Sequence, residues 1–400
     1  MNQRSIETFQ VPITAPPLGD RFAGRWVLLA MVSCHVSGLI FLPMMPLLLG
    51  TLAEEFAVGP IRQGAIGSLQ LGFTAIGAIV LTRLGALYSC RRLVLCALAG
   101  EMFINFCCMM SDSITTITVL RGMSGFTEGM LLAGASAGAA VSRRTERFFV
   151  FYTAALAIFA VIGLSLGAMA IQAYGYSAGF ALFVALDMLG LVLIWKGFPT
   201  FKIERSAGSF DSAADSSYTA NLRPLFAMGL FGVALAGTQT FIERLGDLHG
   251  GSIQIIGVFL SAGWCLAIGT PFLLLPLVRR WGALILIVGA YIFISTVAIL
   301  LSITETLPFF LLAASLFTPA ALFIEPLQFG VLGAIDPGGR LAALGPAAIS
   351  VGSGIGPVLA GAVVGYWGLR AVGVLASVLL ALSVVTLLPA VKKAYETVTV

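Results

Sequence analysis

Charged residues are scarce in this sequence. Only 10% of its 400 residues are Asp, Glu, Lys or Arg, whereas soluble proteins carry about 25%. At the same time 59% of the residues are hydrophobic. A water-soluble fold of this size needs more charge to cover its surface, so the composition excludes a soluble protein and indicates one that lies mostly in lipid. The net charge of +4 is too small to indicate a nucleic-acid partner.

Residues that hold metals, disulfides or nucleotides are also few. The six cysteines lie in or beside apolar segments, so we expect free thiols. The two histidines, His35 and His249, are far apart, so we expect no metal and no other cofactor. The sequence lacks a Gly-x-x-x-x-Gly-Lys-Ser/Thr phosphate loop and any loop large enough for a catalytic domain. We therefore expect neither an ATP-driven pump nor an enzyme.

Long apolar runs dominate what is present. A helix needs about 20 apolar residues to cross a hydrocarbon layer of ~30 Å, and twelve such runs occur. They cover residues 26–49, 60–82, 93–111, 114–141, 148–173, 177–197, 224–245, 252–277, 282–302, 307–334, 340–367 and 370–389. The runs lack the alternation of barrel strands. The sequence predicts an all-α membrane protein with twelve transmembrane helices.

The basic residues predict the orientation of these helices. If the N-terminus is cytoplasmic, 18 of the 22 Lys and Arg residues fall on the cytoplasmic side, as the positive-inside rule requires. We therefore expect both termini in the cytoplasm and the protein in the cell membrane, inner or plasma. The polar residues 1–25 lack the apolar core of a signal peptide, so we expect a short cytoplasmic tail there.

The chain divides into two related halves. Residues 198–223 form the longest stretch of low hydropathy and separate six spans from six. A shift of 197 residues lays Phe126-Thr-Glu128 on Phe323-Ile-Glu325 in equivalent spans. We therefore predict two pseudo-symmetric six-helix bundles, 26–197 and 224–389, joined by a cytoplasmic linker at 198–223 and followed by a cytoplasmic tail at 390–400. Duplicated halves are typical of transporters that bind their solute between them.

Two segments carry a family resemblance. Residues 120–129, which read Leu-Arg-Gly-Met-Ser-Gly-Phe-Thr-Glu-Gly, contain an arginine followed by glycines at four-residue steps. Residues 85–92 read Gly-Ala-Leu-Tyr-Ser-Cys-Arg-Arg. Both segments, and the chain from Trp26 to Pro389, resemble the major facilitator superfamily of secondary transporters.

The resemblance implies a role for Arg121 in proton or substrate handling. It also implies a gating loop made by Gly85, Ser89, Arg91 and Arg92, with Ser89 where the family usually has aspartate. The Gly-Pro signature of antiporters is missing from the span 148–173, which by resemblance weakens a drug/proton antiporter interpretation.

Ionisable residues within the spans are the candidate proton or substrate sites, because a charge in hydrocarbon costs several kcal/mol unless it has a partner or a polar cavity. Arg121 and Glu128 are seven residues apart, which places both on one helix face. Arg121 would attract an anion or set the protonation of a carboxylate, and Glu128 would exchange the coupling proton. The alternative is a charge network that only holds helices together.

The second half supplies Glu325, the repeat counterpart of Glu128, which lies between Pro319 and Pro326. We expect the ionisable groups of spans 114–141 and 307–334 to face one another across a water-accessible chamber. For Glu101 and Asp187 we favour structural pairing, and Glu101 lies at a depth from which it reaches Arg121.

Other polar residues are weaker candidates. Gln239 and Glu243 lie near the outer end of their span, where they would line a gate or form an interfacial salt bridge. His35 would join a proton path, although a lone histidine more often bonds between helices. Gln70 and Gln328 would donate to solute or join helices.

We therefore predict a secondary transporter that works by alternating access, with proton-coupled uptake of a small organic solute, favouring a carboxylate. Its partners would be the solute, protons and the lipid bilayer, and we expect a monomer. One alternative is proton-driven efflux of lipophilic or cationic compounds. The other is a membrane sensor or assembly factor that keeps the scaffold without transporting.

Overall fold

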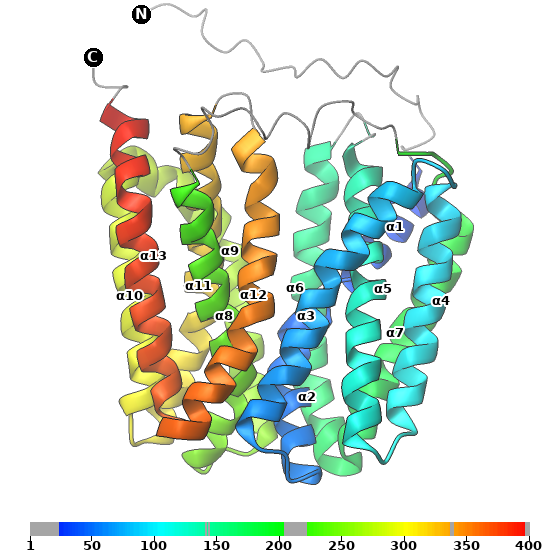
Figure 1. The fold of residues 1–400 in the computed structure, drawn as a ribbon, viewed down its shortest axis with the longest axis horizontal. Helices are drawn as coiled ribbons and strands as arrows, with labels where there is room; N and C mark the ends of the chain where they lie inside the picture. The colour runs from blue at the N-terminus through cyan, green and yellow to red at the C-terminus, as the bar shows by residue number, and fades with distance from the viewer. Residues whose placement is uncertain (1–23, 141, 143–144, 204–221, 337–339, 397–400) are drawn as a thin grey trace, which may run out of the picture.

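Long helices that run side by side make up the protein (Figure 1). The computed structural model describes all residues except 1–23, 141, 143–144, 204–221, 337–339 and 397–400, and within the described residues it contains thirteen α-helices and no strand. The helices are α1 (Arg25–Ser37), α2 (Phe41–Glu55), α3 (Pro60–Leu84), α4 (Cys90–Met109), α5 (Ile114–Ala140), α6 (Thr145–Tyr174), α7 (Tyr176–Gly197), α8 (Arg223–Leu248), α9 (Ile253–Trp281), α10 (Ala283–Ile303), α11 (Leu307–Ile335), α12 (Arg340–Trp367) and α13 (Ala371–Glu396). The all-helical prediction is confirmed. Most of the tail 1–25 and of the linker 198–223 lies outside the described residues.

The first predicted span consists of two helices, α1 and α2, separated by a break at residues 38–40. Proline has no amide hydrogen, so Pro43 cannot donate to the carbonyl of Leu39. That carbonyl instead accepts from the amide of Leu42 at 3.0 Å. Together α1 and α2 form one stretch of 31 residues that is long enough to cross a membrane.

Eleven stretches of the described chain are long and apolar enough to span a membrane. The remaining long helix is α5, which has 27 residues. The most apolar stretch of α5 has a lower mean hydropathy than the corresponding stretches of the other long helices, because α5 carries Arg121, Glu128 and several hydroxyl side chains. The count of twelve spans therefore stays a prediction, in which α5 would cross the membrane as a polar helix among apolar neighbours.

Glycines let helices within each half approach closely. A Cβ atom built on Gly77 or Gly125 would lie 1.9 Å or 2.0 Å from a backbone carbonyl oxygen of the facing helix, which brings α3 against α5. In the second half a Cβ on Gly352 would lie 2.0 Å from the carbonyl oxygen of Gly229, which brings α12 against α8. Small residues at such positions are how membrane helices pack without a hydrophobic driving force.

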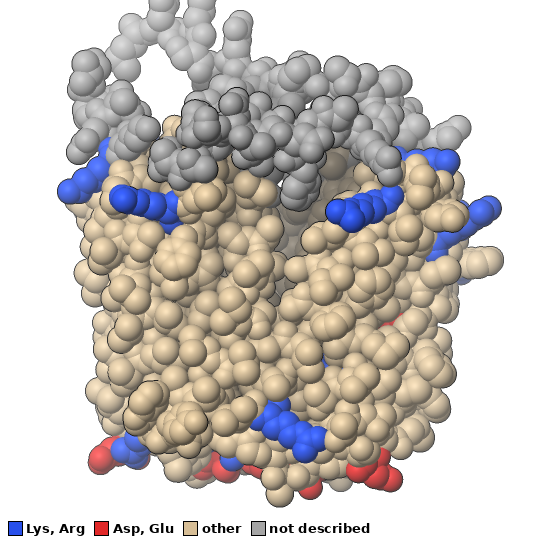
Figure 2. Space-filling model, in the orientation of Figure 1, with Lys and Arg blue, Asp and Glu red and all other residues tan. Residues whose placement is uncertain are grey.

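The two halves contact each other at the end of the bundle where acidic side chains gather, the lower end in Figure 2. There Gln63 of α3 donates to the carbonyl of Thr240 at 3.0 Å, and Ser165 of α6 donates to Ser261 of α9 at 3.0 Å. A Cβ on Gly64 would lie 2.1 Å from the carbonyl oxygen of Pro357. We call this region the closed end.

The opposite end carries most of the described basic side chains and shows a furrow between the halves (Figure 2). Toward this end each half has a hydrophobic cluster of its own. One contains Met31, Leu81 and Phe198 from the first half, and the other contains Met228, Leu332 and Leu341 from the second. The central cluster, in contrast, is shared by both halves. The halves therefore join at the closed end and separate toward the basic end.

Gly64→Ala tests the contact at the closed end. The added methyl group meets a backbone oxygen, so we expect the two halves to separate there. The Ser68 hydroxyl accepts from the Val358 amide at 2.9 Å across the contact. Cysteines introduced at positions 68 and 358 should therefore react with a short cross-linker several-fold less in the Gly64→Ala protein. Gly72→Ala, where a Cβ meets nothing within 4 Å, is the control, and equal cross-linking in both variants would contradict the contact.

Candidate functional site

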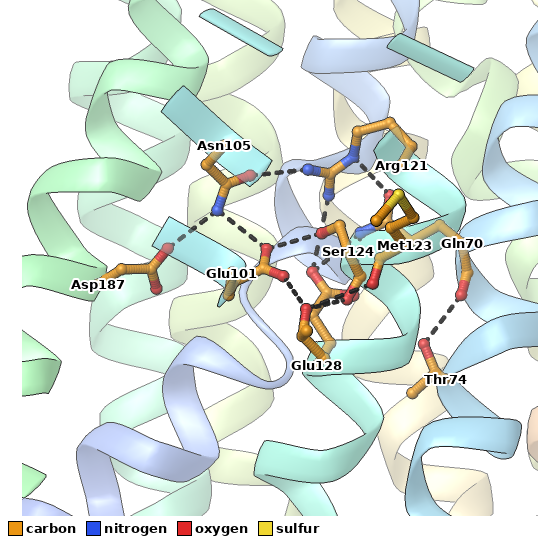
Figure 3. A network of polar contacts seen from close by, with 10 residues as sticks. Gln70, Thr74, Glu101, Asn105, Arg121, Met123, Ser124, Glu128 and Asp187 are labelled. Atoms are coloured by element: carbon orange, nitrogen blue, oxygen red, sulfur yellow. Dashed lines mark hydrogen bonds and ion pairs between the residues drawn. The ribbon is translucent and has the colours of Figure 1, made fainter. Parts of the chain in front are cut away.

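The candidate site is a buried network of charged and polar side chains inside the first six-helix bundle (Figure 3). It joins α3, α4, α5 and α7 through Gln70, Glu101, Arg121, Glu128 and Asp187, all of which are at most 4% exposed. The sequence singled out each of these residues, and the structure brings them together. We call this set, with Asn105, Ser124 and Thr127, the charge network.

Arg121 is the centre of the charge network. Its Nε donates to Gln70 Oε1 at 2.9 Å, and its Nη1 donates to Asn105 Oδ1 at 2.8 Å. Its Nη2 lies 3.7 Å from Glu128 Oε1 and has no hydrogen-bond partner within the described residues. The guanidinium also lies 4.7 Å from the ring centroid of Phe41, at a distance typical of cation–π contacts. Arg121 is therefore enclosed within the first six-helix bundle.

The three carboxyl groups of the charge network are bound by neutral donors. Gln70 Nε2 lies 2.9 Å from both oxygens of Glu128, so one amide links Arg121 to Glu128. Asn105 Nδ2 lies 2.9 Å from Glu101 Oε1 and 2.9 Å from Asp187 Oδ2. Figure 3 shows these dashed contacts crossing between the helices.

The charges of the network do not balance. If all four ionisable groups were charged, three carboxylates and one guanidinium would leave a net charge of −2 on side chains that are at most 4% exposed. Isolated charge in a low-dielectric interior costs several kcal/mol. Two bound protons would make the network neutral. The carboxyl groups of the charge network are therefore its candidate proton-binding groups.

Sequence reasoning missed three members of the network, namely Asn105, Ser124 and Thr127. Ser124 donates to Glu101 Oε1 at 2.7 Å, and the Thr127 hydroxyl donates to Glu101 Oε2. Asn105 had a recognisable signal, because it follows Glu101 by four residues and so shares its helix face. The hydroxyl residues had no comparable signal, since serine and threonine occur throughout the spans.

The expectation that Glu128 and Glu325 face one another across a chamber is wrong for this conformation. Glu128 is 4% exposed and its partners all belong to the first half. Glu325 lies on α11, half-buried, and its carboxylate has no hydrogen bond or ion pair with any described residue. The repeat thus places equivalent acids in different environments, one enclosed and one unpaired.

The other predicted residues lie outside the charge network. Gln328 is fully buried in the second bundle and donates to the hydroxyl of Tyr291, which bonds to Ser383. Gln239 of α8 donates to Thr318 Oγ1 at 3.4 Å within the same half. His35 is half-buried and its ring stacks on Tyr152 of α6 with centroids 4.5 Å apart.

Glu243 lies on α8 at the closed end. It is 3% exposed. A Cβ on Gly50 of α2 would lie 1.7 Å from its Oε2 atom, so this carboxylate contacts the other half of the molecule.

The loop at residues 85–92 contacts the end of α7 and the segment that follows it. Ile203 donates its amide to the Gly85 carbonyl at 2.8 Å, and Arg91 donates to the carbonyl of Trp195. Ser89 precedes α4, and its buried hydroxyl has no partner among the described residues. Arg92 is exposed. These contacts all lie in the first half, so a gating role for the loop remains a prediction.

Comparison with known proteins identifies the architecture. Residues 27–338 match the family model described as Major Facilitator Superfamily. A search of curated proteins found no match. The fold is similar to the nucleoside transporter NupG, with a TM-score of 0.72 and 13% identity over 92% of this chain and 98% of that chain.

Two further solved structures share the fold. A bacterial homologue of the human lysosomal transporter Spinster, in an inward-facing and occupied conformation, gives a TM-score of 0.73 with 13% identity over 93% of this chain and 97% of that chain. The peptide transporter POT in complex with alafosfalin gives 0.71 with 14% identity over 92% and 95%. At these identities the likeness concerns the fold alone.

Asn105→Ala tests whether the charge network holds the first bundle together. The change leaves Arg121 Nη1 and two carboxyl groups without their shared partner, so we expect a loss of about 3 kcal/mol of stability, seen as a lower unfolding temperature of the purified protein. Thr296→Ala is the control, because this exposed hydroxyl bonds only to the Ile292 carbonyl of its own helix. Equal unfolding temperatures in the two variants would contradict the structural importance of Asn105.

Proposed function

We propose a proton-coupled transport cycle for this chain, which belongs to the Major Facilitator Superfamily. The chain is a multi-pass membrane protein with the fold of a secondary transporter. Its halves join at one end and separate toward the other, which supports alternating access by rocking of the two bundles. The solute would bind between the halves, and the protein would act as a monomer in the cell membrane with both termini in the cytoplasm.

Proton coupling rests on the charge network. Three carboxyl groups share one guanidinium among side chains that are at most 4% exposed, so the charge they carry would depend on the number of protons they bind. Glu128 bridges Gln70 of α3 and Arg121 of α5, and a change in its charge alters the contact between these helices. We propose that Glu128 binds the coupling proton and that Arg121 and the neighbouring acids set its charge.

The enclosure of Arg121 argues against a direct contact between its guanidinium and the solute. Its guanidinium is 1% exposed and is occupied by Gln70, Asn105 and Phe41. A carboxylate of the solute would have to displace these partners. We therefore propose uptake of a small organic solute without requiring a carboxylate, and we assign Arg121 to proton handling.

A second candidate function is proton-driven efflux of cationic compounds. The observation that favours it is Glu325, a half-buried carboxylate on α11 without a partner among the described residues. Such a group attracts a cation.

Transport by Glu128→Gln and Arg121→Ala tests the proton path. In proteoliposomes, for a solute found by a thermal-shift screen of organic acids, amino acids, sugars and cations, Glu128→Gln should abolish acceleration by an inward proton gradient. Arg121→Ala should lower uptake at least about tenfold, because the acids lose the cation of the charge network. Thr296→Ala should leave both unchanged. Full, gradient-dependent uptake by both variants would remove the charge network from the mechanism.

Glu325→Gln separates uptake from efflux. If cations are the cargo, the variant should bind a lipophilic cation about tenfold more weakly, and cells expressing it should lose resistance to that cation. Unchanged cation binding, with continued uptake of another solute, would exclude the efflux function.

A further inference from the structure

The closed end contains a carboxylate that the charge network does not use. Glu243 of α8 is 3% exposed, and its Oε2 atom has no hydrogen-bond partner within the described part of the chain. Glu243 also forms no ion pair with a described residue. The one ion pair among the described residues joins Arg121 and Glu128 in the charge network. A buried charged carboxylate without a partner is strongly disfavoured.

The surface that covers Glu243 belongs to the other half of the molecule. A Cβ on Gly50 of α2 would lie 1.7 Å from Glu243 Oε2 and 2.5 Å from Glu243 Cδ. The carboxyl group therefore occupies the space that any side chain at position 50 would need. When the halves separate at the closed end, α2 and α8 part and Glu243 is exposed to the solution on that side.

The charged groups around Glu243 do not neutralise it. Glu54 of α2 and Asp247 of α8 add negative charge nearby, and Arg244 adds one positive charge. The Arg244 guanidinium is directed to α3, where its Nη1 donates to Gln63 Oε1 at 3.1 Å. His249, one turn further on, faces the carbonyls of Leu245 and Thr304 with its two ring nitrogens, at 2.5 Å and 2.6 Å.

We infer that Glu243 is a proton-binding site of the closed end, which takes up a proton from the outer solution when the two halves close over it. Protonation removes the charge that would otherwise be buried against Gly50. Closure is then accompanied by proton uptake, so a lower outer pH favours the conformation described here. This site is separate from the charge network, and the inference rests on the proposed alternating access.

Hydrogen–deuterium exchange of the full-length protein in lipid nanodiscs tests the inference. The readout is exchange in peptides covering residues 45–56 and 238–248, corrected for the intrinsic effect of pH, near pH 5 and near pH 8. In the wild type we expect exchange at least about threefold slower at the lower pH. Glu243→Gln, which is neutral at both pH values, should exchange slowly at both.

Gly50 provides a second and steric test. Gly50→Ala should exchange fast at both pH values, because its methyl group takes the space of the carboxyl group. The double variant Gly50→Ala with Glu243→Ala should exchange slowly at both, since the shortened side chain frees that space. Gly59→Ala is the matched control at the same end, because a Cβ there meets nothing within 4 Å.

Three results would overturn the inference. They are a wild type without the pH effect, a Glu243→Gln protein that keeps it, and a Gly50→Ala protein that exchanges like the wild type. The second result would assign the pH effect to another group at the closed end. If exchange at the closed end depends on pH through Glu243 but the protein transports no solute, the proton site is supported and the proposed transport is refuted.

Discussion

The need to neutralise charge away from water is the constraint on which the first half of this protein depends. Arg121 is 1% exposed, and its Nε and Nη1 groups are hydrogen-bonded only because side chains of α3 and α4 converge on it, while Glu128 of α5 lies 3.7 Å from Nη2 and Asp187 of α7 joins through Asn105. Four helices thus share one electrostatic centre through neutral amides as well as acids. Buried polar networks of this kind stabilise a structure when each member has its partners and weaken it when one is lost.

The two halves meet this constraint differently although they share a fold. In the second half the corresponding interior contains Gln328, Tyr291 and Ser383, which are neutral and bond to one another. Glu325, the repeat counterpart of Glu128, remains without a partner among the described residues. The first half therefore contains the connected network of buried charges. The second half contains two separate acids: Glu325 is half-buried, and Glu243 lies against the other half of the molecule.

Sequence reasoning predicted the helices well because long apolar runs leave few alternatives in a membrane. It also found Arg121, Glu128, Glu101 and Asp187, since charges in such runs are rare. It placed Glu101 within reach of Arg121, but it did not predict that the Arg121 guanidinium contacts Gln70, Asn105 and Phe41, because the rotation of a helix about its axis depends on neighbours that a sequence does not show. The break at residues 38–40 and the contact of Gly50 with Glu243 were missed for the same reason: each depends on tertiary packing.

The short helix α2 touches both of the charged regions described above. Near its start Phe41 covers the guanidinium of Arg121, and two turns later Gly50 lies against Glu243 of the other half. Fifteen residues of one helix thus connect the charge network of the first bundle with the closed end between the halves, so that the position of α2 sets the surroundings of both Arg121 and Glu243.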